Sequence, residues 1–321
     1  MDKLYLGVDL GGTNIAAGIV SPDGTILKKM SIPTDLPKTD EELTERIAGL
    51  CVDLCRGFGI NISDLSCIGI GAPGPVDGET GEVIRAVNLG IFEPWPLGRR
   101  LGELLGIRVF VENDANSAVI AEAMAGCAAG MKDVVIVTLG TGVGGGAFID
   151  GKIYAGFNHM GLEVGHMVIR KGGRLCNCGR RGCFERYASA TALIRDTRKA
   201  MRKDPSSVLW NMSGGPAGVD ARMPFEAAKA GDATAMKVID SYIESLAAGV
   251  VDLVNIFQPQ VLCISGGISN QEQHLIDLLM PYVEREDIAA GAANRTQIKI
   301  AKFKNDAGII GAALVGAYND K

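Results

Sequence analysis

Four residues of types that commonly bind metals lie within one short segment of the chain. They are His166, Cys176, Cys178 and Cys183, in the sequence H-M-V-I-R-K-G-G-R-L-C-N-C-G-R-R-G-C. Thiolates and an imidazole at this spacing can close around one zinc ion in tetrahedral geometry, with Gly179 and Gly182 letting the backbone turn back on itself. Because four protein ligands would leave no open position for water, we expect the ion to organise structure and not to perform chemistry. The Cys-x-Cys spacing is tighter than the usual Cys-x-x-Cys, so incidental thiols in a reduced chain remain the alternative.

Two glycine-rich turns could bind phosphate groups. One reads Asp9-Leu10-Gly11-Gly12-Thr13-Asn14 and the other Gly140-Thr141-Gly142-Val143-Gly144-Gly145-Gly146, each after an apolar strand. Glycine lets the backbone approach a ligand, aligned N–H groups bind anions, and the threonines add hydroxyl donors. Neither turn matches the Walker or Rossmann pattern, and either alone could be a plain hairpin turn. The pair, together with an aspartate that a bare turn does not need, favours nucleotide phosphates.

Three further carboxylates are candidates for work on a substrate. Asp114 lies where a strand meets the start of a helix, the usual place for a functional side chain in an α/β sheet. It could accept a hydroxyl proton during phosphoryl transfer, with magnesium neutralising charge on the γ-phosphate, or it could simply cap the helix. Glu163 and Glu185 flank the Cys/His segment, so a metal there would bring both carboxylates into one place. Glutamates that are merely solvated are the alternative.

Composition narrows the class of protein. The chain has 321 residues, 47% of them hydrophobic, which is enough for two lobes. Its net charge is -5 and its basic residues are scattered, which argues against a nucleic-acid partner. The sequence shows no secretory leader pattern and no apolar run long enough for a membrane, so we expect a cytoplasmic protein. The cysteines outside the Cys/His segment fall in apolar stretches and are expected in the core: Cys51, Cys55, Cys67, Cys127 and Cys263.

Periodicity and turn residues predict alternating strands and helices. In the first part of the chain, strands are expected at 4–8, 15–20, 25–32, 67–71 and 109–111. A helix is expected over 39–57, because Thr39 and Glu42 form a capping box ahead of apolar positions at helical spacing. The strand ending at 111 runs into Glu112-Asn113-Asp114-Ala115-Asn116, at the start of a helix that extends to about 129.

The second part of the chain repeats this design. Strands are expected at 133–139, 147–149, 261–265 and 297–303, and helices at 232–257, 271–286 and 307–318. Residues 203–224 are rich in Pro, Gly and Ser and are expected to be an irregular surface excursion. Because strand, glycine turn and strand occur twice, we interpret the chain as a weak internal repeat with two α/β lobes facing one another across a cleft.

Four motifs occur in order along essentially the whole chain: DLGGTN, ENDAN, LGTGVGGG, and E-V-G-H followed by C-N-C-G-R-R-G-C-F-E. Together they resemble the ROK family (repressor, open reading frame, kinase), and within it the bacterial ATP-dependent glucokinases. The histidine with C-x-C-G-x-x-G-C-x-E is highly specific. The two glycine turns are less so, because they occur throughout the wider actin, Hsp70 and hexokinase superfamily.

The resemblance implies a fold, an activity and cofactors. The fold is α/β and two-lobed, of the ribonuclease-H-like type, with ATP and a hexose bound between the lobes. The N-terminal lobe would comprise 1–112, closed by a helix at about 305–321, and the C-terminal lobe 113–304 with the zinc loop 166–183. The implied activity is that of a glucokinase, which transfers the γ-phosphate of ATP to O6 of glucose with magnesium and a structural zinc. A homodimer or homotetramer is also implied.

The resemblance also assigns roles to residues. Asp114 matches the catalytic base and Asp9 the acidic residue near magnesium, while the turn Ala72-Pro73-Gly74 would line the sugar side. The implied sugar ligands are Asn88, Asn113, Asp114, Glu163, His166 and Glu185, of which His166 would also hold zinc. The implied ligands of ATP are Asp9, Gly11, Gly12, Thr13, Asn14, Gly140, Thr141, Gly142, Gly144, Gly266 and Gly267.

Other functions stay open at this point. The same mechanism could act on N-acetylmannosamine, fructose or allose, and polyphosphate could replace ATP. A sugar-responsive repressor is disfavoured, because only Met1-Asp2-Lys3 precede the first expected strand and the helix-turn-helix domain of such repressors is not seen. A chaperone-type ATPase of the same superfamily would not need the zinc loop.

Overall fold

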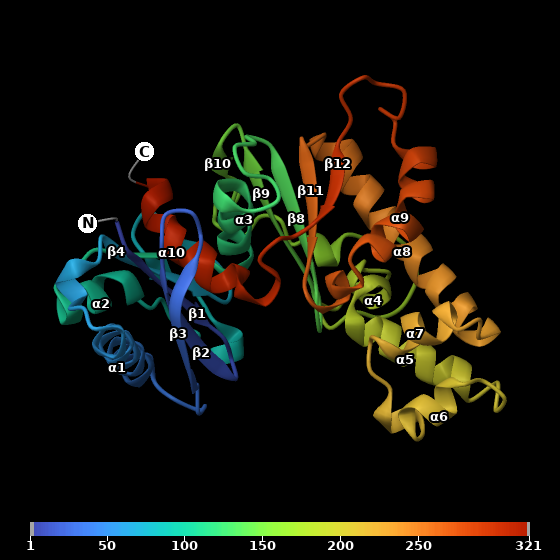
Figure 1. The fold of residues 1–321 in the computed structure, drawn as a ribbon, viewed down its shortest axis with the longest axis horizontal. Coiled ribbons are helices and arrows are strands. Elements are labelled where there is room, and N and C mark those ends of the chain that lie inside the picture. The colour runs from blue at the N-terminus through green and yellow to red at the C-terminus, as the bar shows by residue number, and fades with distance from the viewer. Residues whose placement is uncertain (1–2, 320–321) are drawn as a thin grey trace. The chain divides into compact units, whose positions relative to one another are not determined.

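The computed structural model describes residues 3–319. Within this range the chain folds into two compact units. The N-terminal unit runs to Val134 and also includes Gly146–Leu162 and the chain from Asn305, whereas the C-terminal unit comprises Val135–Gly145 and Glu163–Lys304. Figure 1 shows helices packed beside a sheet in each of them.

The N-terminal unit is built on a five-stranded sheet with the order β3-β2-β1-β4-β7. Its strands are β1 (Tyr5–Leu10), β2 (Asn14–Val20), β3 (Ile26–Pro33), β4 (Cys67–Ala72) and β7 (Val109–Asn113). The first three form an antiparallel meander, and β4 and β7 run parallel to β1. The carboxyl ends of β1, β4 and β7 therefore share one edge, where Asp9 lies opposite Gly71 and Gly71 opposite Glu112. This edge brings Asp9 near the residues that follow β7.

Helices complete the N-terminal unit. They are α1 (Asp40–Phe58), α2 (Leu97–Leu105), α3 (Asp114–Ala125) and α10 (Ala307–Asn319), and a small hairpin is formed by β5 (Val76–Asp77) and β6 (Glu82–Val83). The predicted capping box is present at α1, because Thr39 and Glu42 each accept a hydrogen bond from the other's backbone N–H. α10 packs on α3, β1 and β4. Gly7 and Gly69 permit this approach, since a Cβ there would lie 1.9 and 1.7 Å from backbone oxygens of α10.

A second five-stranded sheet has the order β10-β9-β8-β11-β12. Its strands are β8 (Val134–Leu139), β9 (Val143–Ile149), β10 (Lys152–Ile153), β11 (Val261–Ser265) and β12 (Gln297–Ile300). The order is the same as in the first sheet: three consecutive strands, then two that come later in the chain. β9 and β10 pair antiparallel, and β11 and β12 pair parallel, as do the corresponding parts of the first sheet. The internal repeat predicted from the two glycine turns is confirmed.

The remaining helices belong to the C-terminal unit. They are α4 (Glu185–Ala188), α5 (Ala190–Met201), α6 (Leu209–Ser213), α7 (Met223–Lys229), α8 (Ala233–Phe257) and α9 (Gln273–Glu286). The long helix α8 begins where Asp232 accepts a hydrogen bond from the N–H of Ala235, and it packs against α5, α7 and α9. It therefore forms the main apolar support of this unit.

Some expected elements differ from those observed. The segment 203–224, predicted to be irregular, contains α6 and a 3-10 helix at Pro216–Gly218. The helix that begins at Asp114 ends at Ala125 and not near 129, because Gly126 follows with a backbone conformation outside the helical region. The sequence patterns did not predict α2, α4, α5 or α7.

Most of the cysteines outside the Cys/His segment lie in the core. Cys51, Cys55, Cys67 and Cys263 are buried as predicted, and Cys127 is half-buried. Among residues 3–319, no helix combines the length and the apolar character needed to cross a membrane.

Candidate active site and metal centre

Asp9 and Asp114 lie near one another at the carboxyl edge of the first sheet. Asp9 is a partly buried residue near the end of β1, and Asp114 is the exposed first residue of α3. Burial raises the pKa of Asp9 from 3.8 to about 6, and the negative charge of Asp114 contributes to the rise. Such a pair of carboxylates is suited to a hard divalent cation, whose charge would offset their repulsion.

Asp114 is not the residue that caps its helix. The N-cap is Asn113, whose Oδ1 accepts hydrogen bonds from the N–H groups of Ala115 (2.9 Å) and Asn116 (3.2 Å). Asp114 Oδ1 also accepts a hydrogen bond from Ala115 N, at 2.7 Å. The interpretation of Asp114 as a helix cap is therefore wrong, and a role in chemistry remains for its exposed carboxylate.

Asn113 and Glu112 organise the end of β7. Asn113 Nδ2 donates a hydrogen bond to the carbonyl of Gly74 (2.9 Å), which joins the Ala72-Pro73-Gly74 turn to this edge. Glu112 Oε1 accepts hydrogen bonds from Asn113 N (2.8 Å) and Asn116 Nδ2 (2.9 Å), while burial raises its pKa. Asn113 keeps a second Nδ2 hydrogen for a substrate hydroxyl. Sequence reasoning missed Glu112, although it is the first letter of the E-N-D-A-N motif.

The first glycine turn is held in place from β3. Thr34 is fully buried, its Oγ1 donates a hydrogen bond to the carbonyl of Gly11 (2.7 Å), and its N–H donates to the carbonyl of Thr13 (2.9 Å). Gly12, Thr13 and Asn14 are exposed, so their backbone and side-chain donors can meet a ligand. A Cβ on Gly12 would lie 3.4 Å from the carbonyl oxygen of Asn88, which places Asn88 beside this turn. Thr34 was missed because no sequence pattern marks it.

The second glycine turn is tied to the start of α5. Gly140 N–H donates to the carbonyl of Gly142 at 3.0 Å. Ala190 N–H donates to the carbonyl of Gly140 (2.9 Å), and Thr191 Oγ1 donates to the carbonyl of Thr141 (2.7 Å). These bonds use carbonyl groups of the turn and leave the hydroxyl of the exposed Thr141 available.

Glu185 faces the same turn. Its Oε2 accepts a hydrogen bond from the N–H of Val143 (3.1 Å), and a Cβ on Gly142 would lie only 2.4 Å from that oxygen. Gly266 packs against the residue that precedes this turn, since a Cβ there would lie 2.6 Å from the carbonyl oxygen of Leu139. Two further residues were predicted to bind ATP. Gly144 lies in β9, and Gly267 begins the 3-10 helix Gly267–Gln271 after β11.

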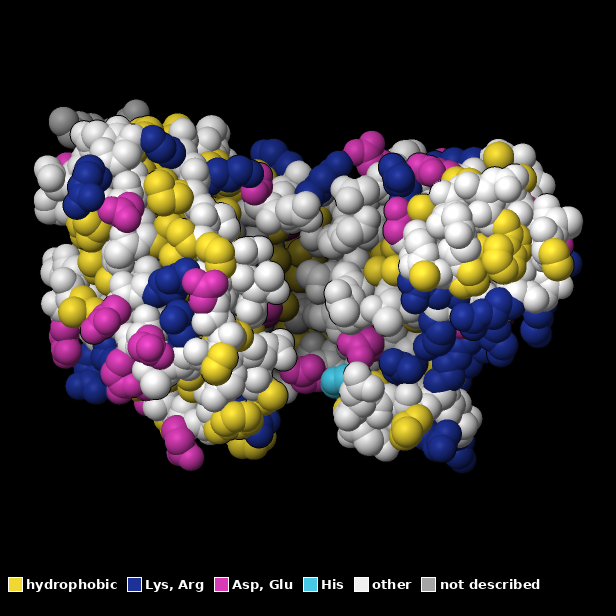
Figure 2. All heavy atoms as spheres, turned by 90° about the horizontal axis from the view of Figure 1, so that it is seen from below, with side chains coloured by type: hydrophobic (Ala, Val, Ile, Leu, Met, Phe, Trp, Pro, Cys, Tyr) yellow, Lys and Arg dark blue, Asp and Glu magenta, His cyan; other side chains and the backbone are white. Residues whose placement is uncertain are grey.

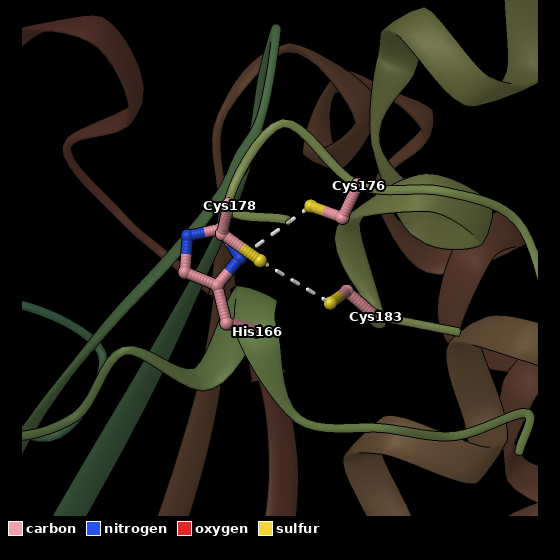
Figure 3. A group of neighbouring side chains, drawn as sticks. All are labelled: His166, Cys176, Cys178 and Cys183. Atoms are coloured by element: carbon pink, nitrogen blue, oxygen red, sulfur yellow. Dashed lines mark hydrogen bonds between the residues drawn. The ribbon is translucent and has the colours of Figure 1, made fainter. Parts of the chain in front are cut away.

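The Cys/His segment forms a compact cluster, in which Figure 3 shows the four side chains converging. The candidate ligand atoms of His166, Cys176, Cys178 and Cys183 lie within 4.8 Å of one another. Cys176 Sγ is 3.7 Å from His166 Nδ1, and Cys178 Sγ is 3.7 Å from Cys183 Sγ. Zn–S bonds of about 2.3 Å in a tetrahedron place two sulfurs about 3.8 Å apart, so the donor set and the spacing suit a four-coordinate ion.

Glycines allow the backbone around the cluster to fold back, as the sequence predicts. Gly179 and Gly182 have φ angles of 85° and 86°. A Cβ on Gly182 would lie 1.8 Å from the carbonyl oxygen of Arg170, so no other residue fits there. Burial raises the pKa of the Cys183 thiol to about 12. A cation is therefore needed to hold this side chain as a thiolate.

One predicted sugar ligand, His166, belongs to the cluster, and another, Glu163, lies three residues before it in the chain. His166 Nδ1 faces the sulfurs and the other ring nitrogen points away from them (Figure 3). Glu163 precedes the 3-10 helix Val164–His166 and is exposed. Its carboxylate forms no hydrogen bond or ion pair with any residue in the range 3–319. Both side chains thus retain groups for a polar ligand.

Asp9→Asn is expected to stabilise the metal-free protein at neutral pH. The folded chain holds the proton of Asp9 more tightly than an unfolded chain, because its pKa is about 6 instead of 3.8. The contribution of Asp9 to the free energy of unfolding therefore falls as the pH rises from 3.8 to about 6, and it stays low at higher pH. The difference between the two pKa values corresponds to at most about 3 kcal/mol in the free energy of unfolding.

Urea unfolding in EDTA at about pH 7.5 and about pH 4.5 checks this prediction, since the gain from Asp9→Asn should shrink at the lower pH. Asp240→Asn, an exposed site on α8, serves as the control. An Asp9→Asn protein no more stable than wild type at the higher pH would contradict the account of Asp9 as a destabilising buried charge.

The chain resembles known proteins over nearly its whole length. Residues 5–317 match the ROK family. The glucokinase of Thermotoga maritima is 38% identical over 316 residues, which are 98% of this chain and 98% of that protein. The N-acetylmannosamine kinase of Escherichia coli O157:H7 is 29% identical over 310 residues, 97% of each chain.

Solved structures agree with this relationship. A ROK family glucokinase from Streptomyces griseus, in complex with glucose and AMPPNP, matches 97% of this chain and 98% of its own with 33% identity and a TM-score of 0.80. The likeness confirms the α/β sugar-kinase fold expected from the motifs. On both sequence and fold, this chain belongs to the ROK family.

Proposed function

We propose that this protein is a glucokinase, which transfers the γ-phosphate of ATP to O6 of glucose. The observation that carries the chemistry is the pair of carboxylates at one sheet edge, Asp114 exposed and Asp9 with a pKa raised to about 6, beside a glycine turn. The near full-length similarity to the Thermotoga maritima glucokinase supports glucose as the acceptor.

Asp114 is proposed as the general base. Its carboxylate would accept the proton of the O6 hydroxyl as that oxygen bonds to the γ-phosphorus of ATP and the bond from this phosphorus to the β-phosphate oxygen breaks, which releases ADP. Asn113 would hold a neighbouring hydroxyl through its second Nδ2 hydrogen. The backbone N–H groups of Gly12 and Thr13 in the first turn, and of Thr141 and Gly142 in the second, would bind phosphate oxygens. Magnesium, when bound near Asp9, neutralises charge on the phosphates.

We further propose that the cluster binds zinc. The ion, when bound, organises the loop, because all four ligands come from protein. With Nδ1 of His166 held by the cluster, its other ring nitrogen carries the hydrogen and can donate it to a sugar hydroxyl. Glu163 and Glu185, which precede and follow the loop, would accept hydrogen bonds from further hydroxyls.

Discrimination among hexoses follows from these polar ligands. A site built to hydrogen-bond a hydroxyl rejects a sugar that lacks it, because buried polar groups are then left unpaired. The alternative acceptor with a specific observation behind it is N-acetylmannosamine, since kinases for that sugar are 29% identical to this chain against 38% for a glucokinase. Fructose and allose are weaker alternatives.

A panel of hexoses with ATP and Mg²⁺ tests this function, with ADP formation as the measurement. Glucose is expected to give the highest kcat/KM and N-acetylmannosamine a much lower one. A higher kcat/KM for N-acetylmannosamine would transfer the assignment to that sugar. Absence of turnover with every hexose, in protein that is folded and carries zinc, would contradict the kinase function.

Gly142→Ala is expected to weaken glucose binding. The added Cβ would lie 2.4 Å from Glu185 Oε2 and would push the carboxylate from its bond to Val143. A displaced Glu185 would lose its hydrogen bond to a glucose hydroxyl. The loss of one such bond to a charged group corresponds to an increase of about 10- to 100-fold in the glucose Kd. Gly140→Ala in the same turn is the matched control, because a Cβ there meets nothing within 4 Å. Calorimetric titration with glucose measures both, and equal Kd values would contradict a role for Glu185 in sugar binding.

The proposed function includes a cytoplasmic location and a homodimer or homotetramer. Support for both comes from the family resemblance. Light scattering coupled to gel filtration would measure the mass of the particle in solution.

A further inference from the structure

A cavity of about 580 Å³ lies in the C-terminal unit, between α5, α8, α4 and the segment that leads into the metal cluster. Its lining includes the buried side chains of Leu193, Val238 and Tyr242. The volume is typical of sites for small molecules. None of its lining residues is among the sugar, phosphate or metal ligands proposed above.

The walls of the cavity are rich in cations. The basic side chains are Arg170, Arg174, Lys199, Lys203 and Lys237, and the acidic ones are Asp196 and Asp204. Figure 2 shows Lys and Arg side chains gathered on the C-terminal unit, on the face seen from below Figure 1. The excess of cations over carboxylates favours an anionic ligand.

The two carboxylates already have partners. Asp196 Oδ2 lies 2.9 Å from Arg174 Nη1 and 3.0 Å from Arg195 Nη2. Asp204 Oδ2 accepts a hydrogen bond from Thr234 Oγ1 (2.6 Å), and hydrogen bonds from neighbouring hydroxyls keep its pKa below the ordinary value. Asp196 is thus paired with arginines, and the charge of Asp204 is balanced in part by Lys237.

Lys199 and Lys203 have no such partner. Their ammonium groups form no hydrogen bond or ion pair with any residue in the range 3–319, and both side chains are exposed at the cavity. Lys199 lies in the last turn of α5, and Lys203 follows that helix by two residues. Two ammonium groups without counter-charge, four positions apart in the chain and lining one cavity, are a feature that a multiply charged anion would satisfy.

The two arginines of the lining pack against an aromatic ring. Their guanidinium carbons lie 4.9 Å (Arg170) and 4.6 Å (Arg174) from the centre of the Tyr187 ring. Tyr187 Oη accepts a hydrogen bond from the backbone N–H of Arg174 at 2.8 Å. Arg174 is already paired with Asp196, whereas the contact of Arg170 with Glu244 Oε2 is long and exposed, at 4.0 Å. The planar guanidinium of Arg170 is therefore the one that suits phosphate oxygens.

We propose that this cavity is a binding site for a phosphorylated small molecule with at least two negative charges, separate from the site of phosphoryl transfer. Lys199, Lys203 and Arg170 bind its phosphate oxygens, and the buried apolar side chains of the lining contact the rest of the molecule. The proposal does not depend on the reaction proposed above, because it can be tested without glucose or ATP.

Calorimetric titration with inorganic pyrophosphate, in magnesium-free buffer of low ionic strength, tests the site. Wild type is expected to show saturable binding that weakens by at least about tenfold in Lys199→Ala/Lys203→Ala, as expected for the loss of two contacts between charged groups. The matched control is Lys3→Ala/Lys152→Ala, which removes two exposed lysines of the N-terminal unit and should bind as wild type does.

Two results would overturn the proposal. One is a pyrophosphate Kd that is the same in both double variants, or the absence of saturable binding in wild type. The other is a change in particle mass by sedimentation velocity that is confined to Lys199→Ala/Lys203→Ala, because the lysines would then serve a contact between protein chains.

Discussion

Asp114→Asn is expected to lower kcat for glucose phosphorylation by about 10²–10⁴-fold, while the affinities for glucose and ATP stay near those of wild type. The amide has nearly the same shape and can still hydrogen-bond the sugar, but it cannot accept the proton of the O6 hydroxyl. Helix α3 should not be disrupted, because its cap is Asn113 and not Asp114. Steady-state kinetics with separate titrations of the two substrates provide the measurement.

Asn113→Ala is the companion variant that separates catalysis from folding. It removes the cap of α3 and should lower the free energy of unfolding by about 1 kcal/mol, whereas Asp114→Asn removes one charge at a helix N-terminus and should cost less than about 1 kcal/mol. If the kcat of Asp114→Asn stays within about threefold of wild type, Asp114 is not the base, because such a loss is far below the range for general bases.

Cys176→Ser and Cys178→Ser are each expected to lose the metal and to weaken glucose binding much more than ATP binding. A closed zinc site contributes on the order of 10 kcal/mol to the folding of its own module. Glu163 and Glu185 lie at the two ends of the loop, so they should lose their positions with it. The turn that carries Gly12 lies on separate strands and is held by Thr34, so ATP binding should suffer less. Elemental analysis measures the metal content, and separate titrations with glucose and with nucleotide measure the two affinities.

Cys127→Ser is the control for the loss of a thiol, because Cys127 is half-buried and lies outside the cluster. It should keep the metal and the affinity for glucose. The account of the cluster is contradicted by less than about half an equivalent of zinc in wild type, or by cluster variants that bind glucose normally.

Structural features that depend on residues close together in the chain could be predicted from the sequence. The capping box at Thr39 and Glu42, the strands that end in glycine turns, and the cluster from His166 to Cys183 depend on short spacings and could be predicted. The same local signals predicted the repeated sheet, because each half contains strand, glycine turn and strand.

Features that depend on distant contacts could not be predicted. Thr34 supports the Gly11 turn from another strand, and the raised pKa of Asp9 results from burial and from Asp114, more than a hundred positions away in the chain. Asp114 was open to two interpretations until the hydrogen bonds of Asn113 showed which residue caps α3. The cationic cavity was also missed, because its walls combine α5, which was not predicted, with α8 and Tyr187.

The most direct test of the central claim is a ³¹P NMR spectrum of a reaction with glucose, ATP and Mg²⁺. The account predicts one new phosphomonoester signal, coupled to the two protons at C6 of glucose, that grows in step with ADP and disappears from the reaction of Asp114→Asn over the same time. ADP accompanied by inorganic phosphate alone, or a phosphate on another hydroxyl of the sugar, would contradict it.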